Sequence, residues 1–114
     1  MMRRAFKQKL ITLTGELSTD EAIQDMEGWD DTEGTRMLVV SAVVPKLLDC
    51  ALYVETAASI NGPWTSVSIA ATGVTLFEAD AAATNKLQRY VRWRVDATAD
   101  DWEACFALEG VTKD

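Results

Sequence analysis

Side chains that could perform catalysis or bind a metal are scarce in this sequence. The chain contains no histidine, which removes Ser-His-Asp and Cys-His catalysis together with the commonest metal ligand. Its two cysteines, Cys50 and Cys105, each lack a second cysteine at zinc-ligand spacing. The glycine-rich loops that bind phosphates are also missing, since neither G-x-x-x-x-G-K-[ST] nor G-x-G-x-x-G occurs. We therefore expect a protein that is not an enzyme, with no catalytic or metal-binding residues and no cofactor.

Carboxylates are the one reactive group that is abundant. Residues 16–33 carry eight Asp and Glu residues and no Lys or Arg, within a chain whose net charge is −7. Solvated carboxylates lack the burial that tunes an acid for catalysis. The glycines and acids of residues 25–34 also resemble a calcium loop, but their spacing does not match an EF-hand. We interpret residues 16–34 as a solvated acidic loop, with a structural calcium site in residues 25–34 as the alternative.

A basic arm precedes the acidic loop. Residues 1–9 contain four cations, which are Arg3, Arg4, Lys7 and Lys9. The arm and the loop either serve solubility as solvated charge or make head-to-tail contacts between copies of the chain. Because a pI near 4.5 opposes binding to phosphates, nucleic acid is not expected as a main partner.

Tryptophan is a candidate for partner contacts, since four tryptophans are many for 114 residues. Trp29 lies among acids, where it either contacts a partner together with Asp30 and Asp31 or packs against its own sheet. Trp64 follows a turn and is expected to close the edge of the core. Trp102 is expected to pack at the rim of the core.

A second candidate surface lies within residues 89–95, which read RYVRWRV. The alternation places Tyr90, Arg92 and Arg94 on one face of a strand, opposite the core face that Trp93 occupies. These three residues either bind a partner's carboxylates or a sugar, or pair with acids on neighbouring strands. The candidate partner-binding residues are therefore Trp29, Asp30, Asp31, Tyr90, Arg92 and Arg94.

Strands must position these residues, because period-two alternation recurs along the chain and helical periodicity does not. The sequence predicts seven strands, over residues 6–14, 36–44, 48–56, 64–70, 74–78, 87–96 and 104–111. The strand over 36–44 is apolar on both faces, as expected of a central strand that is covered on both sides or lies under an interface. Pro45 is expected to end it. A capping-box sequence beginning at Ser18 predicts a short helix over 19–26, with an irregular loop as the alternative.

Together these elements predict one all-β domain spanning residues 1–114. We expect an antiparallel β-sandwich, jelly-roll-like or immunoglobulin-like, with about seven or eight strands and at most one short helix. Cys50 and Cys105 both fall within apolar strands, where we expect buried free thiols, with a single bridge between them as the alternative. No apolar run spans a bilayer or forms an export signal, so we expect synthesis in the cytoplasm and no membrane partner.

Two motifs carry a resemblance to known families. Residues 59–67 (SINGPWTSV) resemble the S-x-D/N-G-x-W-x-x-V hairpin of discoidin-like and carbohydrate-binding jelly rolls, and residues 89–95 resemble their R-Y-V-R strand. Similar patterns occur in small β-sandwich proteins of tailed-phage particles. The resemblance implies a jelly roll and favours an accessory capsid or tail component of a virion, which contacts itself or other structural proteins. A carbohydrate-binding module, with a glycan as its ligand, is the alternative.

Overall fold

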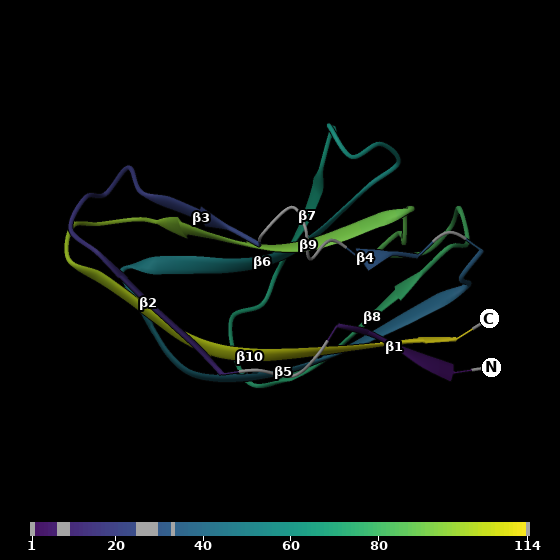
Figure 1. Ribbon diagram of the computed structural model, residues 1–114, viewed down its shortest axis with the longest axis horizontal. Helices are drawn as coiled ribbons and strands as arrows, with labels where there is room; N and C mark the ends of the chain where they lie inside the picture. The colour runs from purple at the N-terminus through teal and green to yellow at the C-terminus, as the bar shows by residue number, and fades with distance from the viewer. Residues whose placement is uncertain (1, 7–9, 25–29, 33, 114) are drawn as a thin grey trace.

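Two antiparallel β-sheets packed face to face make up the structure (Figure 1). The computed structural model describes residues 2–6, 10–24, 30–32 and 34–113, and for residues 2–6 and 30–31 it describes the backbone alone. These residues contain no helix, and hence none that is long and apolar enough to cross a membrane.

The first sheet, called sheet 1, contains the longest strands. Its members are β1 (Met2–Phe6), β2 (Ile11–Gly15), β5 (Met37–Leu48), β8 (Gly73–Glu78) and β10 (Trp102–Lys113). The order is β1-β10-β5-β8, and β2 continues along the edge of β10 that β1 begins. Strands β1 and β2 therefore occupy one edge position.

Sheet 2 has the same plan. Its members are β3 (Glu21–Ile23), β4 (Asp30–Asp31), β6 (Cys50–Ala57), β7 (Thr65–Ser68) and β9 (Tyr90–Ala97). The order is β3-β9-β6-β7, and β4 pairs with the same edge of β9 as β3.

With each interrupted edge counted once, the described chain has eight strand positions. If these positions are numbered 1 to 8 along the chain, the spatial order is 1-8-3-6 in sheet 1 and 2-7-4-5 in sheet 2. This is the order of a jelly roll, in which successive strands cross repeatedly between two sheets. The prediction of an all-β antiparallel sandwich is confirmed.

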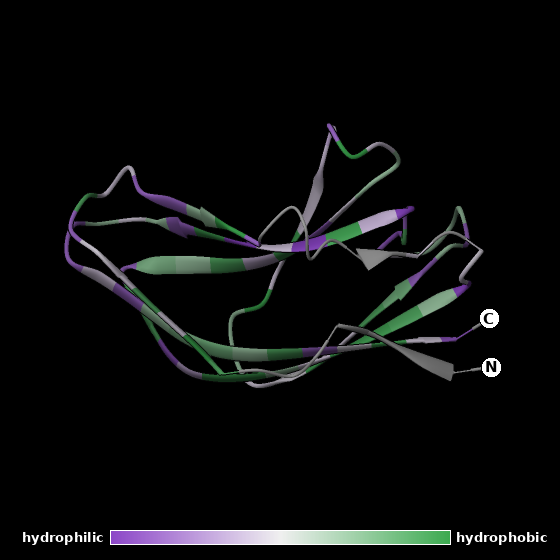
Figure 2. Cartoon of the chain, in the orientation of Figure 1, coloured by the Kyte–Doolittle hydropathy of each residue, from purple (hydrophilic) through white to green (hydrophobic). Residues whose placement is uncertain are grey.

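Alternating apolar residues from both sheets fill the space between them, and Figure 2 shows apolar stretches along the central strands of both layers. Val91 and Val95 of β9 and Val54 of β6 are fully buried. Trp93 packs edge-on against Phe106 of the opposite sheet, with 5.3 Å between ring centroids. The prediction that Trp93 belongs to the core face is therefore confirmed.

The predicted helix over residues 19–26 is wrong. Residues 21–23 form β3, which pairs with β9, and residues 25–26 lie outside the described part of the chain. Asp20 accepts hydrogen bonds from the Leu17 amide and the Trp102 indole, at 3.1 and 3.0 Å. The carboxylate therefore fixes a turn that leads into a strand, where the sequence pattern suggested a helix start.

Pro45 does not end its strand, because β5 continues to Leu48. The pairing between β5 and β10 shifts register opposite Val44 and Pro45, which marks a bulge. Beyond Ala42, β5 has no pairing with β8, so this stretch has only one partner strand. A proline at a bulge next to an unpaired edge removes no essential ladder hydrogen bond.

The basic arm and the acidic loop are partly built into the sheets. Residues 2–6 form β1 on the edge of β10, and the acidic stretch supplies β3 and β4 on the edge of β9. Strands β1 and β4 contact each other, so the two oppositely charged segments are neighbours within one chain. Residues 7–9, 25–29 and 33 lie outside the described residues.

Candidate interaction surfaces

A buried carboxylate organises the outer face of sheet 2. Alternation along β6 turns Glu55 away from the core, and the register places it between Ser66 of β7 and Arg92 of β9. Its oxygens accept hydrogen bonds from Ser66 Oγ at 2.6 Å, Arg92 Nε at 2.7 Å and Arg94 Nε at 3.0 Å. Only 2% of the Glu55 side chain is exposed, against 13% for Arg92 and 18% for Arg94.

Aromatic rings surround this ion pair. The guanidinium of Arg92 lies 4.0 Å from the ring centroid of Trp64, and that of Arg94 lies 4.7 Å from the centroid of Tyr53. Such cation–π contacts strengthen when water is excluded. We call this group the arginine–aromatic cluster; it consists of Tyr53, Glu55, Trp64, Ser66, Arg92 and Arg94.

The pKa values of Glu55 and Arg94 both shift in the direction that favours their charged forms. Burial by itself raises the pKa of Glu55, but the hydrogen bonds from Ser66, Arg94 and Arg92 outweigh it, and the net pKa lies below its usual value. For Arg94, burial lowers the pKa, and hydrogen bonds to Asp96 and Glu55 reverse this and raise it above its ordinary range. The carboxylate and the guanidinium groups therefore stabilise one another's charge.

The structure brings together three of the six predicted partner-binding residues. Arg92 and Arg94 share a face and pair with Glu55 across the neighbouring strand, which is the second of the two alternatives that the sequence leaves open. Tyr90 lies at the start of the same strand, with the Arg89 guanidinium 5.1 Å from its ring centroid. The binding role of these residues stays a prediction.

Two of the other three predicted residues, Asp30 and Asp31, form β4. The backbone of Asp30 and Asp31 pairs with Val91 and Tyr90. Trp29 lies outside the described residues. The backbone of β4 is thus adjacent to the start of β9.

Two expectations about tryptophan have different outcomes. Trp102 is buried in the core, with its indole hydrogen-bonded to Asp20 at its margin. Trp64 does not close the core; it lies on the outer face of sheet 2 against Arg92. Sequence reasoning identified Arg92 and Arg94 but missed Glu55 as their common partner, although the alternation along 48–56 already turned Glu55 outward.

The cysteines are free, as expected, but they are half-buried and not buried. Cys50 faces the space between the sheets and donates to the Glu103 carbonyl at 3.3 Å, and burial raises the pKa of its thiol. Cys105 lies on the outer face of sheet 1, where it accepts from Thr12 Oγ1 at 3.7 Å. Because β10 separates the two thiols, a bridge between them does not form.

The outer face of sheet 1 carries a group of exposed apolar residues. Five residues make up what we call the aliphatic strip: Val39, Val43, Val74, Leu76 and Val111. Val74 is 70% exposed, and Val43 and Leu76 are exposed as well. No described residue outside sheet 1 forms a second layer over this face (Figure 1). Of the two alternatives for residues 36–44, the described residues do not show a covering layer, and an interface over this strand stays a prediction.

Strand β8 is an edge strand of sheet 1, and it carries two residues of the aliphatic strip, Val74 and Leu76. The edge is covered at its C-terminal end, because Glu78 exchanges backbone hydrogen bonds with Asn85 and Leu87. The side-chain amide of Asn85 also donates to the Leu76 carbonyl, at 3.1 Å. Backbone groups of every second residue in a strand point to the same side, so the N–H and C=O of Val74, like those of Glu78, point away from β5. Among the described residues these two groups have no partner, which leaves a short open edge.

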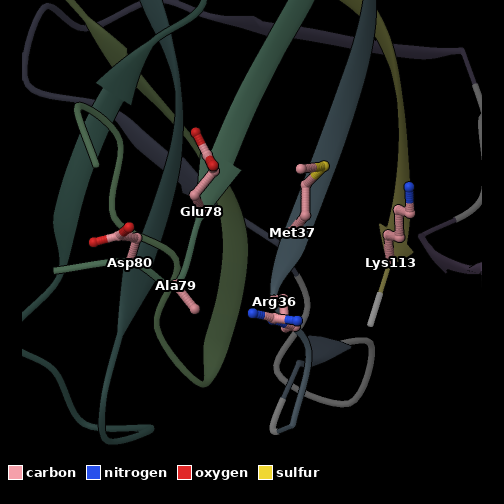
Figure 3. Close-up of a pocket in the computed structure, with 6 residues that line it drawn as sticks. All are labelled: Arg36, Met37, Glu78, Ala79, Asp80 and Lys113. Atoms are coloured by element: carbon pink, nitrogen blue, oxygen red, sulfur yellow. The ribbon is translucent and has the colours of Figure 1, made fainter. Parts of the chain in front are cut away.

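A hollow of about 560 Å³ adjoins the end of the strip. Its lining combines two cations and two acids, from Arg36, Met37, Glu78, Ala79, Asp80 and Lys113. Figure 3 shows Glu78, Met37 and Lys113 side by side on three adjacent strands. The charged groups therefore border the apolar surface.

Comparisons with known proteins add little to this picture. No protein-family model matches the chain, and no curated protein matches it. A solved structure, titled "Bacillus endospore appendages form a novel family of disulfide-linked pili", is similar over 97% of this chain and 90% of that one. The sequence identity is 10% and the TM-score is 0.45. A likeness at this level carries no functional argument.

Proposed function

We propose that this protein is a non-enzymatic structural protein that assembles with copies of itself, or with other structural proteins, through the outer face of sheet 1. The aliphatic strip is the observation that carries the proposal. Contiguous exposed apolar patches on soluble proteins mark interaction sites. The cores of protein interfaces contain fewer charged residues than the rest of the surface. The five members of the strip are uncharged, and the charged side chains of Glu78, Glu109 and Lys113 lie beside it on the same face.

The fold supports the finer form of this proposal. Jelly rolls form viral capsid proteins as well as lectins, so the architecture suits an accessory capsid or tail component of a phage-like particle. This support is an analogy between folds. The non-enzymatic part of the proposal rests on the missing histidine and the missing phosphate-binding loops.

A carbohydrate-binding module is the second candidate. The observation in its favour is the arginine–aromatic cluster, in which Tyr53 and Trp64 lie beside polar side chains, as in sugar sites. However, a guanidinium lies over each of these rings and reduces the area left for a sugar. A glycan array compared between the wild type and Trp64→Ala or Tyr53→Ala tests this candidate.

Light scattering coupled to size-exclusion chromatography tests the main proposal. Over a range of concentrations we expect a mass that rises above the 12.5 kDa of one chain. Val74→Asp should abolish the rise, because it introduces a charge into the aliphatic strip. Ile60→Asp is the matched control, since Ile60 is also exposed but lies in a loop of sheet 2. A wild-type chain that stays monomeric at millimolar concentration would contradict self-assembly.

A further inference from the structure

We propose that two copies of the chain dock face to face on sheet 1 about a twofold axis that runs along β5. In this dimer, Lys113 of each copy pairs with Glu78 of the other. The inference rests on the proposed function and specifies its geometry. It is carried by the arrangement of charge across the end of the sheet.

One cross-strand row holds opposite charges at its two ends. Lys113 of β10 pairs with Met37 of β5, which pairs with Glu78 of β8. All three side chains border the same hollow and lie on one face (Figure 3). Among the described residues, neither the Lys113 amine nor the Glu78 carboxylate has an ion pair or a hydrogen bond. Both charged groups are therefore available to a partner.

A twofold axis along β5 exchanges the two sides of the sheet. It places the β10 side of one copy over the β8 side of the other. Lys113 of each copy then lies over Glu78 of the other copy, which gives two identical Lys–Glu pairs. Opposite charges facing across an interface fix its orientation. An in-plane axis across the strands would instead place Lys113 on Lys113 and Glu78 on Glu78, which is repulsive.

The neighbouring row brings apolar residues into contact under the same axis. Val111, Val39 and Leu76 are aligned across β10, β5 and β8. Turned about β5, Val111 of one copy lies over Leu76 of the other, and Val39 lies over Val39. Packed sheets are about 10 Å apart, a distance that facing Lys and Glu side chains can bridge. The same twofold rotation thus pairs the opposite charges of one row and brings the apolar residues of the next row into contact.

The size of the surface determines how strong the dimer is. Three strands about 4.8 Å apart, over seven residues that each rise about 3.3 Å, cover roughly 300 Å² per copy. A standard stable interface covers about 800 Å² per partner. The strip and the charged row can therefore only be the centre of the contact, and we expect a dimer that dissociates on the order of micromolar concentration or above.

Charge reversal tests this geometry. In Glu78→Lys both ion pairs become Lys–Lys contacts, and in Lys113→Glu both become Glu–Glu contacts, so each variant alone should dimerise about tenfold or more weakly. The two variants mixed should form a heterodimer, because each of the two contacts then joins one lysine to one glutamate. The double variant should dimerise like the wild type. Sedimentation velocity at low salt measures all four.

Two further readings separate the geometry from the proposed function. The difference between the single variants and the wild type should shrink in 1 M NaCl, where the Debye length is about 3 Å. Glu109→Lys changes a residue on the same face but outside the row. Mixing this variant with Lys113→Glu should therefore not restore dimerisation. If the wild type self-associates but mixing the single variants restores nothing, the twofold geometry is wrong and the assembly proposal stands. If the wild type never associates, both fail.

Discussion

Glu55 is the residue on which the outer face of sheet 2 depends. A carboxylate with 2% exposure carries a desolvation cost, which is offset here because three donors bind its two oxygens. The ion pair as a whole therefore contributes little net stability compared with an apolar replacement. Removal of one member is different, because it leaves the remaining charges without their partner.

We predict that Glu55→Gln lowers the free energy of unfolding by about 1–3 kcal/mol, because Arg92 and Arg94 lose their common counter-charge while partly buried. Urea denaturation measures the change. Glu103→Gln is the control: it breaks the pair with Lys46, in which both side chains are about half exposed, and should change stability by at most about 0.5 kcal/mol. Equal effects of the two variants would show that the burial of Glu55 is unimportant.

The lowered pKa of Glu55 predicts a pH dependence. The folded chain binds this proton at a lower pH than the unfolded chain, whose Glu titrates at about 4.3. The stabilisation is therefore complete above the unfolded value and is lost as the pH falls through the lowered folded value. The difference in unfolding free energy between wild type and Glu55→Gln should be constant near neutrality and shrink in acid. A difference that grows in acid would mean that the folded pKa is raised.

The sequence located part of this site and not the rest. Alternation alone placed Tyr90, Arg92 and Arg94 on one face, because side-chain direction in a strand depends only on parity. The partner of the arginines depends on which strand lies beside β9 and in which register, and neither is encoded locally. For the same reason the sequence predicted Trp64 in the core: the strand beside it is visible in the sequence, but the arginine of β9 that it meets on the same outer face is not.

At the scale of elements, a glycine explains how β2 meets β10. Gly15 is paired with Trp102, and the indole lies across the place where a side chain would project. A Cβ there would fall within 3.0 Å of both the Trp102 ring and the Asp20 carboxylate. The missing side chain lets the indole reach Asp20 and tie the 15–20 turn to the core.

We predict that Gly15→Ala destabilises the fold by about 1–3 kcal/mol, because Trp102 and its hydrogen bond must shift. Gly73→Ala is the matched control in another strand of sheet 1, since a Cβ there meets nothing within 4 Å. That variant should be neutral or slightly stabilising, as expected where alanine fits the backbone. Thermal unfolding followed by circular dichroism compares them, and a Gly15→Ala variant as stable as the wild type would contradict the close approach.

Long alternating segments were predicted well and short edge segments were not. The strands over 48–56 and 87–96 match β6 and β9 closely, because eight residues give enough alternation to recognise. Strands β3 and β4, of three and two residues, are too short for a pattern. They form because β9 offers them an unpaired edge, which is a tertiary effect.

At the scale of the whole molecule, the charged segments belong to the fold as well as to the surface. Since residues 2–6 pair with the end of β10, we predict that deleting residues 1–9 costs at least about 1 kcal/mol, or about 4 °C in Tm. Substituting Gln for Arg3 and Arg4 keeps the strand and should cost much less. Differential scanning calorimetry measures both, and an unchanged Tm after the deletion would show that β1 adds nothing to stability.

The strand order also determines how quickly the chain can fold. Among the strand pairs of the described residues, only β6 and β7 are consecutive in sequence, and the first strand of sheet 1 pairs with the last. Each of the other pairs must close a long loop before any contact rewards it, which places the folding time in the millisecond to second range. On the ribosome, sheet 1 stays incomplete until β10 has emerged, and Val39, Val43 and Val74 are exposed throughout that interval. The surface that we propose for assembly is thus also a surface that can aggregate prematurely during synthesis.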